Sequence, residues 1–313
     1  MGYYNCYEYI IVDILEKNEI NSAEFFNKSG LAVYVDKKEG DKNLDVFFSS
    51  RENLYEEELA QNYNLNLIPI KANTNNLVTQ IDDLLKNKKQ IIGAVDTFYL
   101  PYCRSYQKEH YFHFIQVEER DTNNYFITDN YYGYQGKINK EIVASYMREG
   151  IKIGDFHFLY YDPKEIKIND TDNKIKKTIK HNYNLLTDIK YYKNTSNVDL
   201  YIGLNALIKT QELIHIAYDN KDFDLIDKIS TGITQITHTR RHFYDYLNSL
   251  NIEDLRLKYF ECYQKWQILQ NFLLKVVFLN SFQAAKLNNI SKSIYEVEKA
   301  ERKCIQSLME MKD

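Results

Sequence analysis

Three side chains that could together perform acyl transfer stand far apart in the sequence: a cysteine at position 6, a histidine at 113 and an aspartate at 129. Cys6 lies where a short helix is expected to begin. The free N–H groups and partial positive charge of a helix N-terminus stabilise a thiolate and can bind a developing oxyanion. Cys6 is therefore a candidate nucleophile; a small buried hydrophobe is the alternative interpretation.

His113 and Asp129 are expected on consecutive strands of one hairpin. A strand begins at His113, a turn is expected at 121–124, and the next strand ends at Asp129. The two residues should be close neighbours, on the same face if the pairing register allows it. The carboxylate would then fix the imidazole tautomer and stabilise imidazolium, which leaves the other nitrogen for the thiol. A turn aspartate beside an incidental strand histidine is the alternative.

The order of these groups and the residues around them resemble a known family. The segments that carry the resemblance are Val95–Tyr102, His110–Val117 and Phe126–Asp129. They are similar to the N-terminal domain of the butirosin biosynthesis acyltransferase family, a relative of the papain-like C39 cysteine proteases, over residues 3–165. Asn130 stands where the family often has proline, and Tyr7 where a small residue is common. Neither departure removes a catalytic group, although Tyr7 alters the loop before the helix.

The resemblance implies a papain-like catalytic domain and acyl transfer through a cysteinyl thioester. An acyl or peptidyl group would arrive on the phosphopantetheine of a carrier protein and leave on a small amine, as in amide synthases of the closthioamide type that use a diamine. By this resemblance Cys6 is the nucleophile, His113 the base and then the acid, and Asp129 the orienting group. No bound cofactor is implied, because the phosphopantetheine belongs to the donor.

Four further residues are candidates for oxyanion or substrate contacts. The backbone N–H of Cys6 is the natural first oxyanion donor, and the Asn5 side chain is a second unless Asn5 serves only as the helix N-cap. Asp96 ends an expected strand and could bind an ammonium acceptor, with Tyr99 and Tyr102 as aromatic walls. The alternative for Asp96 is a structural aspartate that hydrogen-bonds a loop.

Proline and glycine separate two halves of different character. All three prolines and eight of the ten glycines precede position 165. Before that point a helix near Cys6, a second helix at 75–87 and several strand-like runs predict an α+β catalytic domain over residues 1–165. The expected strands lie at 31–35, 44–48, 67–70, 91–95, 113–117, 124–128 and 156–160.

The second half, residues 174–313, predicts an all-α bundle that follows a linker at 169–173. Apolar residues recur at helical spacing, as in Ile226, Ile229 and Ile233. The expected helices run near 173–190, 196–219, 222–250, 252–282 and 285–311. These helices could dock the carrier protein, form a homodimer or close over the active site.

Composition argues against several other classes of function. The net charge of −4 and the lack of a basic stripe make nucleic acid an unexpected partner. The four cysteines form no CxxC pair, and His238 and His242 lack an evident third ligand, so no metal site is expected. Neither a signal peptide nor an apolar membrane span is evident, which favours a cytoplasmic protein. Arg240 and Arg241 could contact an acidic carrier.

Two alternatives to acyl transfer remain open. The same triad would serve a C39-like cysteine peptidase or thioesterase, in which water takes the place of the amine. The second alternative is a papain-like shell without catalysis that serves as a binding module. Acyl labelling of Cys6 distinguishes the enzymes from the binding module, and amine against water as acceptor distinguishes the two enzymes.

Overall fold

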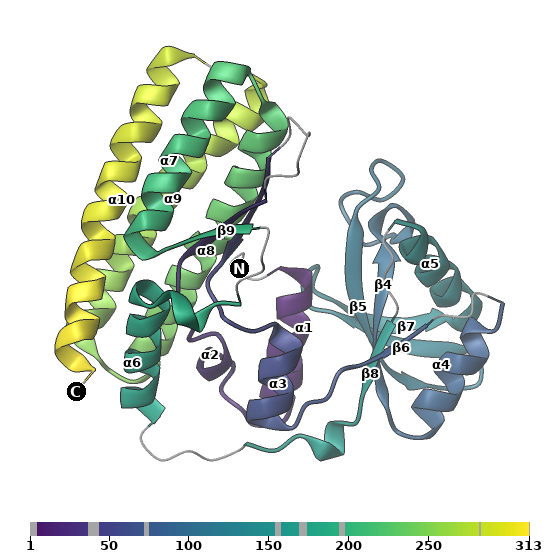
Figure 1. Cartoon of the computed structure of the whole chain (residues 1–313). Coiled ribbons are helices and arrows are strands. Elements are labelled where there is room, and N and C mark those ends of the chain that lie inside the picture. Colours follow the sequence, from purple (N-terminus) through teal and green to yellow (C-terminus); the bar gives the residue numbers. More distant parts are fainter. Residues whose placement is uncertain are drawn as a thin grey trace. The chain divides into compact units, whose positions relative to one another are not determined.

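The computed structural model describes residues 5–36, 44–71, 75–153, 158–168, 174–193, 198–281 and 283–312. The chain divides into two compact units (Figure 1): unit 1 comprises Met1–Ser22 and Tyr55–Asp170, and unit 2 comprises Ala23–Leu54 and Thr171–Asp313. The expected linker at 169–173 lies outside the described residues. Among the described helices, none combines the length and apolar character that a membrane span requires.

Unit 1 is built on an antiparallel sheet of six strands in the order β3-β8-β4-β5-β6-β7. Consecutive hairpins β4-β5-β6-β7 form its larger part, since each of these strands pairs with the next along the chain. The strands are β3 (Ile68–Ile70), β4 (Gln90–Asp96), β5 (Phe112–Arg120), β6 (Asn124–Asp129), β7 (Tyr134–Asn139) and β8 (Phe158–Tyr161).

Helices cover both faces of this sheet (Figure 1). Buried side chains of α4 (Leu77–Lys86) and α5 (Lys140–Ile153) pack on one face, where Ile115 of β5 and Ile127 of β6 belong to the same core. The opposite face of β5 meets α1 (Cys6–Lys17), because the Tyr7 ring lies 5.2 Å from the ring of Phe114. The short helix α3 (Tyr55–Tyr63) adjoins α1.

Unit 2 combines long helices with a small sheet. Its three strands pair antiparallel in the order β2-β1-β9, and its longest described helices are α8, α9 and α10. The strands are β1 (Ala32–Asp36), β2 (Asp45–Ser49) and β9 (Val198–Ile202), and the helices are α6 (Lys174–Thr187), α7 (Gly203–Asn220), α8 (Phe223–Ser249), α9 (Glu253–Leu279) and α10 (Ala284–Met311). The short helix α2 (Ser22–Phe25) begins where the chain passes from unit 1 into unit 2.

Residues 23–54 belong to the core of unit 2. Phe48 of β2 is 1% exposed and packs against α8 at Gly232, where an added Cβ would lie 2.0 Å from the Phe48 ring. The fully buried guanidinium of Arg240 donates to the carbonyl oxygens of Ser29 and Gly30, at 3.0 and 3.1 Å. A glycine and a buried arginine of α8 therefore hold this early segment against the helices.

The structure confirms the α+β class and corrects the expected domain boundaries. The expected domain 1–165 is interrupted, because the strand at 31–35 pairs with 198–202 of the later half, and the strand at 44–48 pairs with 31–35 in the same sheet. For the same reason the expected all-α domain 174–313 is not all-α. The residues Val198–Ile202 had been included in a helix at 196–219, but they form β9, and α7 begins at Gly203.

Candidate active site

The N-terminus of α1 is fixed by contacts on both sides of Cys6. Asn5 is the helix N-cap: its Oδ1 accepts the backbone N–H of Glu8 at 2.9 Å, while the Glu8 carboxylate accepts the N–H of Asn5 at 2.8 Å. This reciprocal pair is a capping box. Helix α3 adds two bonds, from the Tyr55 hydroxyl to Glu8 and from the Tyr7 hydroxyl to Glu56, each 2.6 Å long.

Cys6 is therefore the first residue of a well-anchored helix. Its backbone N–H has no acceptor within the helix, since the first N–H groups of any helix lack one. The Cys6 side chain is partly exposed. Asn5 acts as the helix cap, which was the alternative to an oxyanion contact in the sequence analysis.

His113 lies between Asp129 and Cys6. Its Nε2 is 2.8 Å from Asp129 Oδ2, and both side chains are almost completely buried. Burial lowers the pKa of His113, but hydrogen bonding to Asp129 and to Cys6, together with their negative charges, raises that pKa to about 9. Because Nε2 faces the carboxylate, Nδ1 is the nitrogen left for the thiol. The structure thus brings together the three residues that the sequence singled out.

A β-bulge puts His113 and Asp129 on the same face of the sheet. Near the turn Glu119 pairs with Phe126, but beyond Glu118 the register shifts so that Val117 pairs with Ile127. Continued along the ladder, the shifted register sets Asp129 opposite Ile115, two residues from His113 on the same face. The register before the bulge would set Asp129 opposite Gln116, and its side chain would lie on the other face.

A second cysteine lies near this carboxylate but in a different environment. Cys103 is 6% exposed, and burial together with the charge of Asp129 raises the pKa of its thiol to about 12. A thiol with that pKa stays protonated at neutral pH and is a poor nucleophile. Cys6 is partly exposed, begins a helix and adjoins an imidazole, so it is the reactive candidate of the two.

Aromatic rings surround the His113–Asp129 pair. Tyr132 packs edge-on against the imidazole, with ring centroids 5.1 Å apart, and Tyr131 lies at 5.7 Å. Tyr102 stacks on Tyr134 at 4.0 Å, and burial and then the charge of Asp129 raise the pKa of the Tyr102 phenol. These rings limit the access of water to the carboxylate.

Asp96, which was expected to bind an ammonium ion, is buried and bonded within the protein. Asp96 is 2% exposed, its Oδ1 accepts the backbone N–H of Phe98 at 3.0 Å, and its Oδ2 lies 2.6 Å from Nδ1 of His110. Tyr99 is near this pair, with its ring centroid 6.3 Å from that of His110. Tyr102 is not a wall of this group, because it stacks beside Asp129 instead. Asp96 therefore has both oxygens bound within the protein, and its exposed partner is His110, a residue that the sequence analysis gave no role.

The two arginines of α8 that the sequence suggested for carrier binding form ion pairs within unit 2. Arg240 is fully buried and pairs with Glu301 at 2.7 Å, while Arg241 pairs with Asp245 at 3.1 Å. The proposed two-arginine surface for an acidic carrier is therefore wrong.

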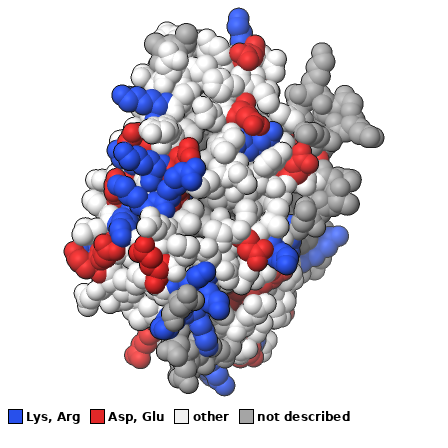
Figure 2. Space-filling model, turned by 60° about the vertical axis from the view of Figure 1, so that its left-hand side comes forward, with Lys and Arg blue, Asp and Glu red and all other residues white. Residues whose placement is uncertain are grey.

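Figure 2 shows one face of the molecule, on which acidic and basic side chains are interspersed. Within the described part of the chain, no three His, Cys, Asp or Glu side chains gather as metal ligands would.

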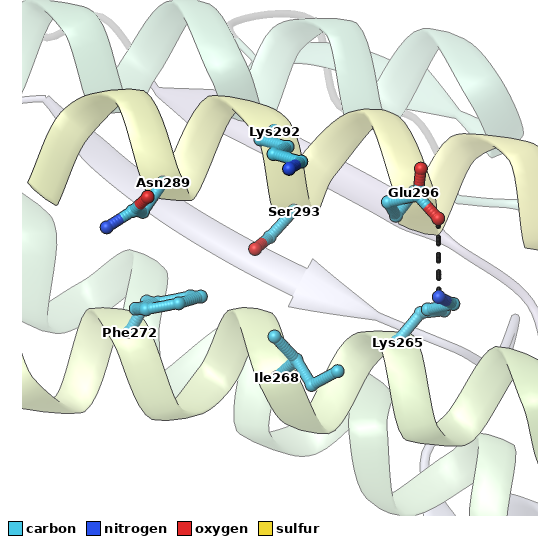
Figure 3. Close-up of a pocket in the computed structure, with 7 residues that line it drawn as sticks. All are labelled: Lys265, Ile268, Phe272, Asn289, Lys292, Ser293 and Glu296. Atoms are coloured by element: carbon cyan, nitrogen blue, oxygen red, sulfur yellow. Dashed lines mark hydrogen bonds and ion pairs between the residues drawn. The ribbon is translucent and has the colours of Figure 1, made fainter.

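A groove of about 270 Å³ runs between α9 and α10 of unit 2 (Figure 3). Phe272 and Ile268 of α9 form its apolar side, and Lys265 pairs across it with Glu296 of α10 at 3.2 Å. It contains neither a thiol nor an imidazole among its lining residues.

An imidazole held between a helix-borne thiol and a buried carboxylate is the arrangement by which proteins activate a cysteine for nucleophilic attack. Residues 5–130 match the family model described as butirosin biosynthesis protein H, N-terminal. The resemblance inferred from the motifs is thus confirmed over a segment that includes Cys6, His113 and Asp129. A comparison with curated proteins found no match.

Proposed function

We propose that this chain is an amide-forming cysteine acyltransferase of thiotemplated, non-ribosomal natural-product biosynthesis. The observation that carries the proposal is the position of the His113 imidazole, between the buried Asp129 carboxylate and the partly exposed Cys6 thiol. The matched family points in the same direction, to an acyltransferase-like biosynthetic function. A papain-like arrangement, with the cysteine on a helix and the histidine on an antiparallel sheet, is part of the proposal.

In the first half-reaction Cys6 attacks the thioester of an acyl or peptidyl carrier protein. His113 holds the proton of the Cys6 thiol as imidazolium, which its raised pKa favours, and Asp129 stabilises that charge. The backbone N–H at the start of α1 donates to the developing oxyanion. The carbon–sulfur bond to phosphopantetheine breaks, the leaving thiolate takes the proton from His113, and the acyl group remains on Cys6.

In the second half-reaction a small amine attacks the Cys6 thioester. A carbon–nitrogen bond forms, the carbon–sulfur bond breaks, one N–H proton of the attacking amine passes to the neutral His113, and the Cys6 thiolate is restored beside the resulting imidazolium. The aromatic rings around His113 favour this outcome over hydrolysis, since they limit the access of water. The carrier protein and the amine are the proposed partners, and the helices of unit 2 are available for carrier docking or for a homodimer.

The test is intact-protein mass spectrometry after incubation with an acyl thioester of N-acetylcysteamine, a short analogue of phosphopantetheine. We expect wild type to gain the mass of the acyl group, Cys6→Ala to gain none, and Cys103→Ala to behave as wild type. The two cysteine variants are matched controls, because they remove the same group from positions that differ in exposure and pKa.

Chasing the acylated protein then separates the alternatives. Loss of the acyl mass to an added amine, with the amide detected, supports transfer. Equally fast loss in buffer alone would identify a thioesterase or peptidase. If wild type gains no acyl mass and a thiol-directed electrophile does not label Cys6 selectively, the site is not catalytic. The result would then favour the alternative hypothesis of a binding module.

A further inference from the structure

The Asp96–His110 pair is a second carboxylate–imidazole dyad in unit 1. The Asp96 carboxylate is 2% exposed, and its Oδ2 lies 2.6 Å from Nδ1 of His110. The His110 side chain is 57% exposed, although its ring is held by stacking on Phe98, with centroids 4.2 Å apart and planes inclined by 12°. A buried carboxylate therefore orients an imidazole whose Nε2 is directed away from it.

This dyad lies at the same end of the sheet as Cys6. Asp96 ends β4 and pairs with Phe112, while the residue before it, Val95, pairs with His113. The Phe112 ring packs on Phe114 at 4.9 Å, and Phe114 packs on Tyr7, the residue after Cys6, at 5.2 Å. Ring contacts thus lead from Phe112, the strand partner of Asp96, to Tyr7 at the start of α1.

The proposed reaction has a proton requirement that His113 does not meet alone. A primary amine of ordinary basicity, with a pKa of about 10 like that of lysine, reaches the site as an ammonium ion at neutral pH. Its nitrogen must lose two protons before it becomes the nitrogen of an amide. One of them can remain with the Cys6–His113 pair when the thiolate is expelled, but the other must leave for solvent.

His113 is poorly placed to pass that second proton to solvent, because its side chain is only 4% exposed. His110 has the opposite character: it is exposed, and its partner is a carboxylate that stabilises the imidazolium formed when it takes a proton. General bases must be oriented as well as basic, and the stacking on Phe98 supplies the orientation.

We propose that His110 is the base that takes the first proton from the incoming ammonium acceptor, with Asp96 as its positioning residue. This inference rests on the proposed function and adds the acceptor side of the site: the acceptor is a basic primary amine. The ammonium N–H proton passes to Nε2 of His110, and the nitrogen lone pair then forms the carbon–nitrogen bond. The carbon–sulfur bond breaks with its electron pair on Cys6 Sγ, the remaining proton goes to His113, and His110 releases its proton to water.

The test separates acylation from transfer in the full-length protein. Wild type and His110→Gln are acylated with the N-acetylcysteamine thioester, and the adduct at Cys6 is followed by mass spectrometry. The acylated proteins are chased with propylamine, which is charged at neutral pH, or with methoxyamine, which is uncharged. His215→Gln, an exposed histidine on α7 of unit 2, is the matched control.

We expect His110→Gln to be acylated at the wild-type rate and to transfer to propylamine about 10²-fold more slowly, the usual worth of a general base. Transfer to methoxyamine should be unchanged, because that probe needs no prior deprotonation, and His215→Gln should match wild type with both amines. Asp96→Asn should reproduce the selective defect to a smaller extent.

Two results would overturn the inference while leaving the proposed function intact: wild-type transfer to propylamine by His110→Gln, or equal slowing with both amines. The second would mean that His110 only shapes the site. Wild-type protein that is acylated at Cys6 yet transfers to neither amine would instead refute the transfer reaction and this inference with it. A wild-type protein that is never acylated would refute the proposed function at its first step.

Discussion

Replacement of Asp129 by asparagine should uncouple His113 from Cys6 while the fold is kept. In wild type, Asp129 and Cys6 raise the pKa of His113 from 6.5 to about 9 against the effect of burial. That change corresponds to about 3 kcal/mol in favour of imidazolium. Asparagine keeps the size of the side chain but not its charge. The pKa of His113 should then fall below about 9, since burial remains and only the bond to Cys6 and its charge still raise it.

The consequence is a less reactive thiol at neutral pH. Imidazolium stabilises the Cys6 thiolate, so its loss should slow alkylation of Cys6 by iodoacetamide at pH 7 by about 10-fold to 10²-fold, the larger value being the factor that the whole 3 kcal/mol supports. The rate is measured by mass spectrometry of the Cys6 peptide between pH 5 and 10. Asp121→Asn is the matched control, because Asp121 caps the turn of the same hairpin and is far from the imidazole in the ladder.

The free energy of unfolding should also depend on the interaction between His113 and Asp129. A pKa that is higher in the folded than in the unfolded protein stabilises the fold fully below pH 6.5, and the contribution is lost as the pH rises through about 9. The free energy of unfolding of wild type should therefore fall across that window, and the fall should be smaller in Asp129→Asn. Unchanged alkylation and an unchanged pH dependence in Asp129→Asn would refute the assignment of Asp129.

Three further predictions concern other parts of the chain. Cys103→Ala should keep the wild-type alkylation rate at pH 7, as measured on the Cys6 peptide, because the Cys103 thiol with a pKa of about 12 does not compete for the reagent. Phe48→Ala should lower the free energy of unfolding by about 3–5 kcal/mol, and Gly232→Ala by about 1–3 kcal/mol because its Cβ would clash with the Phe48 ring; urea denaturation checks both. Burial raises the pKa of Glu52, but the bond to His181, the charges of Lys28 and His181 and a backbone hydrogen bond together lower that pKa to about 2. Stability should therefore be lost as the pH falls from 4.5 to about 2, and this loss should be absent in Glu52→Gln.

The parts of the fold that sequence reasoning recovered are those with local signals. Helices α8 and α9 follow from apolar residues at helical spacing with no proline and a single glycine, Gly232, and the start of α1 follows from Asn5 and the apolar stripe behind it. The pairing of β1 with β9 was missed, because it joins segments more than a hundred residues apart and no local pattern records the partner of a strand. Assigning residues 23–54 to unit 2 required the contact of Phe48 with Gly232.

The same distinction holds within the site. The hairpin that carries His113 and Asp129 could be predicted, since both strands and the turn between them have clear signals. Whether the two side chains share a face depended on a single residue, because one step of register moves every side chain to the other side of a sheet. Glu118 is the extra residue of a β-bulge and shifts the register by one residue. The local sequence Glu118-Glu119-Arg120 contains no signal that predicts a bulge.

The Asp96–His110 pair is a case in which one residue could be predicted from the sequence but its partner could not. Asp96 was recognised at its strand end and expected to contact an ammonium ion directly, but the carboxylate has both oxygens occupied within the protein. The group that reaches solvent is the imidazole of His110, which stands fourteen positions away along the chain. For an ammonium ion to contact the buried Asp96 carboxylate directly, the ion would have to lose its hydration and Asp96 would have to lose its bond to His110. The exposed imidazole of His110 can take the proton without either loss. If the acceptor is an ammonium ion, its first proton therefore leaves through His110, and the two dyads divide the work: Asp129–His113 controls the thiol, and Asp96–His110 prepares the amine.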